Sequence, residues 1–123
     1  MKRKFKVSQN SSVKIKAIRY GGLDLRRVWE LAGTAGISAY HVTMPAHYRH
    51  ETIYHAHTHE WFYVLSGTTT VTVDGKPRRL RPGSSIYMAP GVPHLVRAGK
   101  EPVKVLAFFS PSMDIAKPDV VKI

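Results

Sequence analysis

The chain has 123 residues, 43% of them hydrophobic, which suits one folded domain with one core. It contains no cysteine, so disulfides and thiolate metal sites are excluded and any bound metal must take nitrogen and oxygen ligands. The formal net charge of +11 leaves nucleic acid, anionic lipid or an acidic small molecule open as partners. The basic residues are scattered, however, and no nucleic-acid-binding motif accompanies them, so we rank nucleic-acid binding last.

The location of the protein is expected to be the cytoplasm. No apolar run approaches the length of a membrane span, so we expect no membrane association. Residues 1–7 are basic, but no apolar segment follows them, and we therefore expect no signal peptide.

The first third of the chain gives three secondary-structure predictions. Residues 13–17 alternate apolar and charged side chains, which predicts a half-buried strand. Residues 24–31 have apolar side chains at helical spacing before Gly33, which predicts a short helix or, alternatively, an extended edge segment. Residues 36–44 alternate again, and Pro45 ends this predicted strand because proline cannot donate to a sheet.

Further strands are predicted along the rest of the chain. They are rich in β-branched and aromatic residues, are separated by glycine and proline turns, and cover residues 61–65, 68–73, 76–80, 85–88 and 103–109. Asp74 and Gly75 predict a type I′ hairpin turn, in which both central residues need positive φ. Many short strands and little helix indicate an all-β sandwich or barrel.

Strand faces follow from the alternation of side chains. Glu60, Phe62 and Val64 share the predicted inner face of their strand, whereas Trp61 and Tyr63 face away from it. We expect these two outward aromatic residues to pack in a sheet or dimer interface. Four other large apolar residues are assigned to the core by default, namely Tyr87, Met88, Phe108 and Phe109.

Residues 55–59 read His-Ala-His-Thr-His and are followed directly by Glu60. In an extended strand His55, His57 and His59 would project from one face. Imidazole and carboxylate groups are the usual ligands of zinc, iron, nickel, copper and manganese. A solvated surface tract of histidines is the alternative interpretation. The isolated His94, which follows a Pro-Gly-Val-Pro turn, favours the metal site over the surface tract.

Two motifs give the chain a family resemblance. Glu60 is followed after six residues by Gly67, and Gly83 is followed after six residues by Pro-Gly-Val-Pro and then His94. In this order and at this separation, the motifs resemble those of the cupin superfamily. The resemblance implies an all-β double-stranded β-helix, or jelly-roll barrel. We predict a single cupin domain over residues 1–123, with a core barrel at about 39–110, an N-terminal strand arm and a short C-terminal tail.

The same resemblance implies one divalent metal ion inside the barrel. The ligands it implies are His55, His57, Glu60 and His94, and His59 is an alternative to His55 or Glu60. The spacing departs from the family pattern, because counting back three or four residues from Glu60 reaches no His-x-His pair. Glu60 and His57 also fall on opposite strand faces unless a bulge or tight turn separates them. The identity of the metal (Zn, Fe, Ni, Mn or Cu) stays open.

Two functions stay open at this point. One is a metal-dependent enzyme of dioxygenase, isomerase or lyase type that acts on a small organic molecule in the barrel. Glu60 would be its catalytic general base if it is not a ligand, and Arg49 or Arg97 would hold an anionic substrate. The other is a non-catalytic module that binds or senses a small ligand. We also expect a homodimer, in which residues 13–17 and 103–109 would contribute to the interface.

Overall fold

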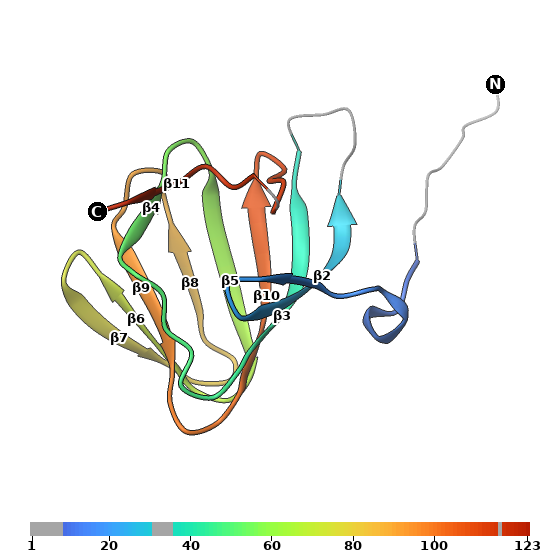
Figure 1. Cartoon of the computed structure of the whole chain (residues 1–123), viewed down its shortest axis with the longest axis horizontal. Coiled ribbons are helices and arrows are strands. Elements are labelled where there is room, and N and C mark those ends of the chain that lie inside the picture. The colour runs from blue at the N-terminus through green and yellow to red at the C-terminus, as the bar shows by residue number, and fades with distance from the viewer. Residues whose placement is uncertain (1–8, 31–35, 116) are drawn as a thin grey trace.

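Two antiparallel β-sheets face each other in the computed structural model of the chain, which describes residues 9–30, 36–115 and 117–123 (Figure 1). Within these ranges the first sheet has the strand order β1-β2-β3-β10-β5-β8 and the second has the order β11-β4-β9-β6-β7. The strands are Ile18–Tyr20 (β1), Leu23–Glu30 (β2), Ser38–Met44 (β3), Ile53–His55 (β4), His59–Ser66 (β5), Thr69–Val73 (β6), Lys76–Leu80 (β7), Ser85–Met88 (β8), His94–Ala98 (β9), Val103–Ser110 (β10) and Val120–Lys122 (β11). The expected all-β jelly-roll class is confirmed.

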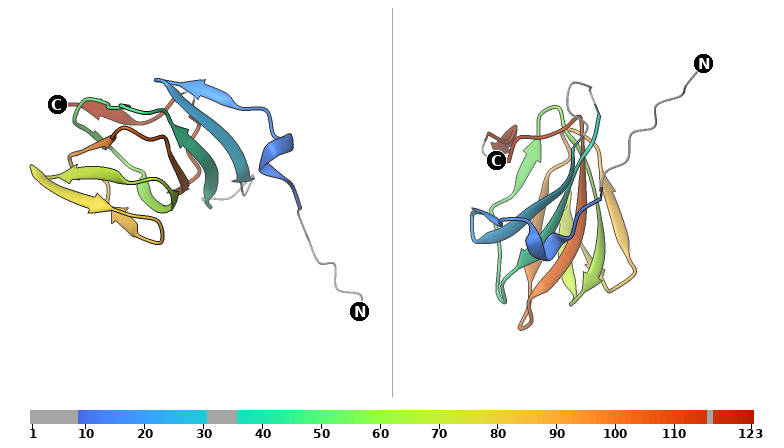
Figure 2. Two further views of the ribbon diagram at one scale, coloured as in Figure 1. Left: turned by 90° about the horizontal axis from the view of Figure 1, so that it is seen from below. Right: turned by 90° about the vertical axis from the view of Figure 1, so that its right-hand side faces the viewer.

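The chain crosses from one sheet to the other at most of its connections. From β3 to β6 each strand lies in the sheet opposite to the strand before it, and the same is true from β7 to β11. Figure 2 shows the two sheets as two layers in views at right angles. Because of these crossings, residues that are close in sequence, such as those of β4 and β5, lie on facing walls of one interior.

Alternating side chains of the facing strands form the core. On β5, Phe62 and Val64 are buried while Trp61 and Tyr63 are 36% and 37% exposed, so the predicted inner and outer faces are confirmed. On β10 the buried residues are again every second one, from Val103 to Phe109. Apolar side chains from both sheets thus fill the interior, as the pleat of a strand requires.

The turns explain two of the glycines. Asp74 and Gly75 have φ values of +49° and +77° between β6 and β7, which confirms the predicted two-residue hairpin turn. Gly67, between β5 and β6, has a φ of +76°, and a Cβ atom there would lie 2.4 Å from the carbonyl oxygen of Pro102. A larger residue at Gly67 would therefore meet both backbone strain and a steric clash.

One prediction for the first third of the chain is wrong, and the structure decides between two alternatives for another. Residues 13–17 do not form a strand: Ser12–Lys14 is a 3₁₀ helix (η1), and Val13 is 79% exposed. Residues 24–30 of the second predicted segment are not helical, because Leu23–Glu30 is strand β2 and pairs with β3, and residue 31 lies outside the described residues. Pairing with neighbouring strands buries Leu25 and overrides the short helical pattern. The extended alternative therefore holds, but β2 lies between β1 and β3 and not at the edge of the sheet. The predicted helix stop at Gly33 lies outside the described residues.

Two side chains that the sequence predicts for the core lie on the outer face of the first sheet. Tyr87 on β8 is 55% exposed, and Phe108 on β10 is half-buried, with its ring 5.0 Å from that of Trp61. Both point away from the interior because their buried neighbours, Met88 and Phe109, take the inward positions.

Among the residues that the structure describes, no helix is long and apolar enough to span a membrane.

Candidate metal centre

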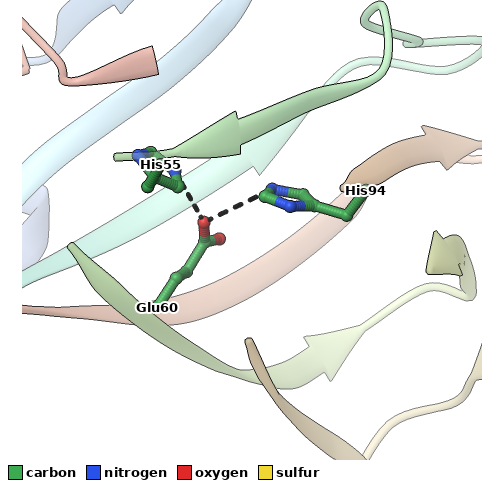
Figure 3. Close-up of side chains that lie close together, drawn as sticks. All are labelled: His55, Glu60 and His94. Atoms are coloured by element: carbon green, nitrogen blue, oxygen red, sulfur yellow. Dashed lines mark hydrogen bonds and ion pairs between the residues drawn. The ribbon is translucent and has the colours of Figure 1, made fainter. Parts of the chain in front are cut away.

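Three predicted ligands, His55, Glu60 and His94, converge in the interior between the sheets (Figure 3). His55 ends β4 and His94 begins β9, so the two imidazoles come from the second sheet, while Glu60 reaches them from β5 in the first. The Oε1 atom of Glu60 lies 3.2 Å from Nε2 of His55 and 3.8 Å from Nε2 of His94. The side chains are 6%, 13% and 3% exposed for His55, Glu60 and His94, so the group is shielded from bulk water.

A tight connection between β4 and β5 brings His55 and Glu60 to facing walls. β4 ends at His55, the next three residues form no strand, and β5 begins at His59. The carboxylate of Asp119 accepts hydrogen bonds from the backbone N–H groups of His57 (2.7 Å) and Thr58 (3.0 Å) and holds this connection. The strand alternation is therefore broken between His55 and Glu60, and both side chains point inward.

His94 is held by the turn that precedes it. Gly91 in this turn has a φ of +83°, and its N–H donates to the carbonyl of His55 over 2.8 Å. The carbonyl of Pro93 accepts a hydrogen bond from the N–H of Asp74 over 3.0 Å. The two proline residues of this turn also restrict the backbone before His94. These contacts place the second motif against the first at a fixed distance.

The environment of His55 favours its charged form. Burial alone disfavours the imidazolium, but hydrogen bonds and Coulombic attraction from Glu60 and Asp119 outweigh it and raise the pKa of His55. For Asp119 burial again acts against the charge, but hydrogen bonds from His57, Thr58 and His55 outweigh it and lower the pKa to about 2. Asp119 is therefore an ionised partner of His55 at neutral pH.

The geometry of the three donors fits a metal ion. Ligand atoms that each lie about 2.1 Å from one metal stand about 3.0–3.4 Å apart at octahedral or tetrahedral angles. The observed separations of 3.2 and 3.8 Å come close to this, and all three donor atoms lie within 4.8 Å of one another. Two imidazoles with one carboxylate form the protein part of catalytic zinc and non-haem iron sites, which keep positions open for substrate.

The group opens onto a cavity of about 520 Å³. Most of its lining is apolar and comes from both sheets and the C-terminal segment, with Phe62, Val105, Phe109, Met113 and Ile115 among the contributors. Polar residues also line it, among them Tyr48, whose pKa is raised to about 12 by burial and by the charge of Glu60. Such an apolar cavity with a few converging polar groups is the usual form of a small-molecule site.

Neither His57 nor His59 joins the group that the described residues form. His57 is exposed in the connection after β4. His59 is exposed on the outer face of β5, where its Nδ1 lies 2.6 Å from the Tyr87 hydroxyl and its ring stacks on that of Tyr87. The expectation that His55, His57 and His59 project together is wrong, because these residues span two strands and a turn.

His50 lines the cavity, yet its ring nitrogens are already engaged. Its Nε2 accepts a hydrogen bond from the N–H of Val96 (3.1 Å), so its Nδ1 carries the proton that it shares with the carbonyl of Glu51 (2.6 Å). Burial is the main cause that lowers the pKa of His50. Of the two predicted anion-binding arginines, Arg49 lines the cavity, whereas Arg97 is exposed and lies outside the lining that the described residues form.

Sequence reasoning missed Asp119. It lies in the segment that the sequence predicts as a C-terminal tail, but Val120–Lys122 forms β11 and pairs with β4, next to which it is drawn in Figure 1. Asp119 is 64 positions from His55, and no spacing in the sequence relates the two. Only the pairing of β11 with β4 reveals this contact.

Comparisons with known proteins agree with this fold. The solved structure of KdgF from Halomonas sp. has a TM-score of 0.80 and 21% identity, over 91% of this chain and 100% of that one. Ectoine synthase from P. lautus has a TM-score of 0.80 and 16% identity, over 95% of this chain and 90% of that one. Pac13 of Streptomyces, a protein described as a nucleoside dehydratase, has a TM-score of 0.76 and 10% identity, over 96% of this chain and 93% of that one.

A more distant structure is an HTH_3-family transcriptional regulator from Vibrio cholerae, with a TM-score of 0.61 and 18% identity over 72% of this chain and 51% of that one. No curated protein sequence matches the chain. The family model described as "Cupin domain" matches residues 40–109, which is more than half of the chain and includes Glu60 and His94. The chain therefore belongs to the cupin domain family.

Proposed function

We propose that this cupin binds one divalent metal ion through His55, Glu60 and His94 and acts as an enzyme on a small organic molecule in the barrel. The observation that carries the proposal is the meeting of two imidazoles and one carboxylate, from opposite sheets, at the wall of a largely apolar cavity. The metal would supply Lewis-acid or oxygen-activating chemistry. Reactions of the dioxygenase, isomerase or lyase type all fit such a centre.

The described residues around the centre would bind and shield the substrate. The apolar side chains of both sheets exclude water from the cavity, which strengthens electrostatic interactions within it. Arg49 lines the cavity and is exposed, so it would hold a carboxylate or phosphate of the substrate by paired hydrogen bonds. We infer a substrate with a mainly apolar body, an oxygen atom directed at the metal and at most one anionic group.

Glu60 has two possible roles in this proposal. Its Oε1 lies near Nε2 of both imidazoles, as expected of a shared ligand. A carboxylate that does not bind the metal would instead be free to take a proton from the substrate as the general base. Replacement by glutamine separates these roles, because a ligand role predicts weaker metal binding and a base role predicts normal metal binding with lost turnover.

The alternative is a non-catalytic module that binds or senses a small ligand. The likeness to a transcriptional regulator of Vibrio cholerae favours it, although this chain resembles that protein over only 51% of the regulator's length. Ectoine synthase and the nucleoside dehydratase Pac13 are enzymes by name, and they cover far more of this chain. At such low identity these likenesses concern the fold, so the choice depends on experiment.

The experiment starts from protein without a histidine tag, loaded in turn with zinc, iron(II), manganese, nickel and copper. Small aromatic and aliphatic acids, alcohols and amides are screened by thermal shift against each metal form, and compounds that bind are followed by mass spectrometry. An enzyme converts at least one of them in a metal-dependent way, and His94→Ala abolishes the conversion. Saturable binding without any product over long incubation would favour the sensing module.

We also propose a homodimer in the cytoplasm. The exposed apolar residues on the outer face of the first sheet include Trp61, Tyr63 and Leu65 on β5 and Tyr87 on β8, at 36%, 37%, 43% and 55% exposure. These side chains lie next to one another across neighbouring strands, since Trp61 pairs with Tyr87 of β8 on one side and with Phe108 of β10 on the other. A second copy that packs the same face against this one would cover these side chains in an isologous contact.

A further inference from the structure

The segment that follows β10 returns to the metal centre through Asp119. The residue lies directly before β11, and its backbone carbonyl accepts a hydrogen bond from the N–H of Ala56 over 3.0 Å. Its side chain is 23% exposed and is directed at His55 and the connection after β4. Through the side chain of Asp119 the C-terminal segment contacts the imidazole of a candidate ligand, in addition to the strand pairing of Val120 with His55.

The two carboxylate oxygens of Asp119 have different partners. Oδ2 accepts the backbone N–H groups of His57 and Thr58, at 2.7 and 3.0 Å. Oδ1 accepts the hydroxyl of Thr58 at 2.8 Å and lies 3.0 Å from Nδ1 of His55. One oxygen therefore holds the backbone of the connection, and the other contacts the imidazole.

The contact with Asp119 decides which nitrogen of His55 faces the centre. A carboxylate can only accept hydrogen bonds, so Nδ1 of His55 must carry a proton and donate it. The opposite nitrogen, Nε2, then faces Glu60 at 3.2 Å and is the atom available to a metal. A metal-bound histidine usually donates its other N–H to a carboxylate or carbonyl, which fixes the ring and raises its basicity.

His94 has the same arrangement with a different acceptor. Its Nδ1 lies 3.0 Å from the carbonyl oxygen of Val92 and donates to it, so its Nε2 also faces Glu60. The acceptor for His94 is backbone within its own turn, whereas the acceptor for His55 is a side chain from a distant segment. A side-chain substitution can therefore remove the acceptor that orients His55, whereas the backbone carbonyl that orients His94 stays in place.

We propose that Asp119 is a positioning residue of the metal centre, which holds His55 with Nε2 directed into the cavity and so makes the C-terminal segment part of the site. This inference rests on the proposed metal function. Asp119 is not one of the three candidate ligands. Its Oδ1 acts on the centre through His55, while its Oδ2 holds the connection after β4. The segment after residue 110 thus contributes to the site in two ways. Asp119 contacts His55, and Met113, Ile115, Pro118 and Val120 line the cavity.

The test compares Asp119→Ala with Thr58→Val. Both variants remove hydrogen bonds that hold the connection after β4, but only Asp119→Ala removes the acceptor of His55. Zinc affinity is measured by competition with a chelator, and the ring nitrogens of His55 are followed by ¹⁵N NMR with and without zinc. We expect Asp119→Ala to weaken zinc binding by about 10- to 100-fold, the usual cost of losing such a partner, while Thr58→Val stays within about threefold of wild type.

The NMR signal reports the orientation of His55 independently of zinc affinity. Wild type and Thr58→Val should show a proton on Nδ1 of His55 that exchanges slowly with water, and Asp119→Ala should lose this protection. Asp119→Leu replaces Asp119→Ala if the latter does not fold, because leucine keeps a similar side-chain size and offers no acceptor to His55. Equal zinc affinity and an unchanged His55 signal in the Asp119 variant would overturn the proposal.

The design also separates the two proposals. Wild-type protein that binds no zinc, iron or manganese would contradict the proposed function, while the His55 signal in the same sample still shows whether Asp119 orients the ring. Tight zinc binding in wild type that persists in the Asp119 variant would leave the metal centre standing and refute the role of Asp119. Similar losses in Asp119→Ala and Thr58→Val would also refute it, because they would show a general effect on the connection.

Discussion

The two ends of the histidine run have opposite environments, although they lie four residues apart. His55 is 6% exposed, faces the interior and contacts Glu60 and Asp119. His59 is exposed on the outer face of the first sheet and contacts Tyr87. The same residue type therefore lines the candidate metal centre at one end and packs on the outer surface at the other.

The difference comes from the connection between the ends. A single extended strand would place both side chains on one face, but β4 stops at His55 and β5 starts in the other sheet at His59. Hydrogen bonds from His57 and Thr58 to Asp119 fix this crossing. The ligand set is therefore decided by where the chain changes sheets, and not by the spacing of the histidines.

The largest expected effect concerns the inner and middle histidines of the run. His55→Ala should weaken zinc binding by more than about 100-fold, because loss of a ligand exceeds the 10- to 100-fold cost of losing a supporting partner. His57→Ala, the matched control, should change it by less than about threefold, since His57 is exposed and contributes its backbone N–H to Asp119. Chelator competition measures both values, and equal losses in the two variants would contradict the assignment.

A smaller effect is expected for Glu60→Gln. The amide keeps one oxygen in place of the carboxylate but removes the negative charge, so metal affinity should fall by at least about tenfold. The measurement is the same zinc competition, with the far-ultraviolet circular dichroism spectrum as a control for folding. Unchanged affinity together with lost turnover would instead assign Glu60 as the general base.

How much of this could be predicted from the sequence depends on the range of the contacts involved. The hairpin at Asp74 and Gly75 and the inward positions of Phe62 and Val64 follow from local φ preferences and from alternation, and the structure agrees with them. The meeting of Glu60 and His94 was implied by family resemblance. The contact of Asp119 with His55 could not be predicted, because it depends on the pairing of β11 with β4 across 64 positions.

The outer face of the sheet gives a further prediction. If the homodimer packs Trp61 and Tyr63 of one copy against the other, the double change Trp61→Glu and Tyr63→Glu should raise the dissociation constant of the dimer at least about tenfold. Light scattering over a range of concentrations measures this constant. Zinc affinity should stay unchanged, because both side chains point away from the cavity. Wild-type protein that is monomeric at micromolar concentration would count against the dimer.

The smallest expected effect belongs to the outer end of the histidine run. His59→Ala removes one exposed hydrogen bond and one stacking contact with Tyr87, so the free energy of unfolding should fall by less than about 1 kcal/mol. Urea denaturation of the metal-free protein measures this difference. The metal content should equal that of wild type, and any marked loss of metal would show that His59 reaches the centre.

The most direct test of the central claim is the metal content of tag-free protein, measured by mass spectrometry on wild type and on His94→Ala after the same loading and desalting. His94 comes from the second motif on β9, so its assignment as a ligand does not depend on the spacing of the histidine run. We predict close to one metal ion per chain in wild type and loss of most of it in His94→Ala, with the circular dichroism spectrum unchanged. Full metal occupancy in His94→Ala would contradict a metal centre between the two sheets.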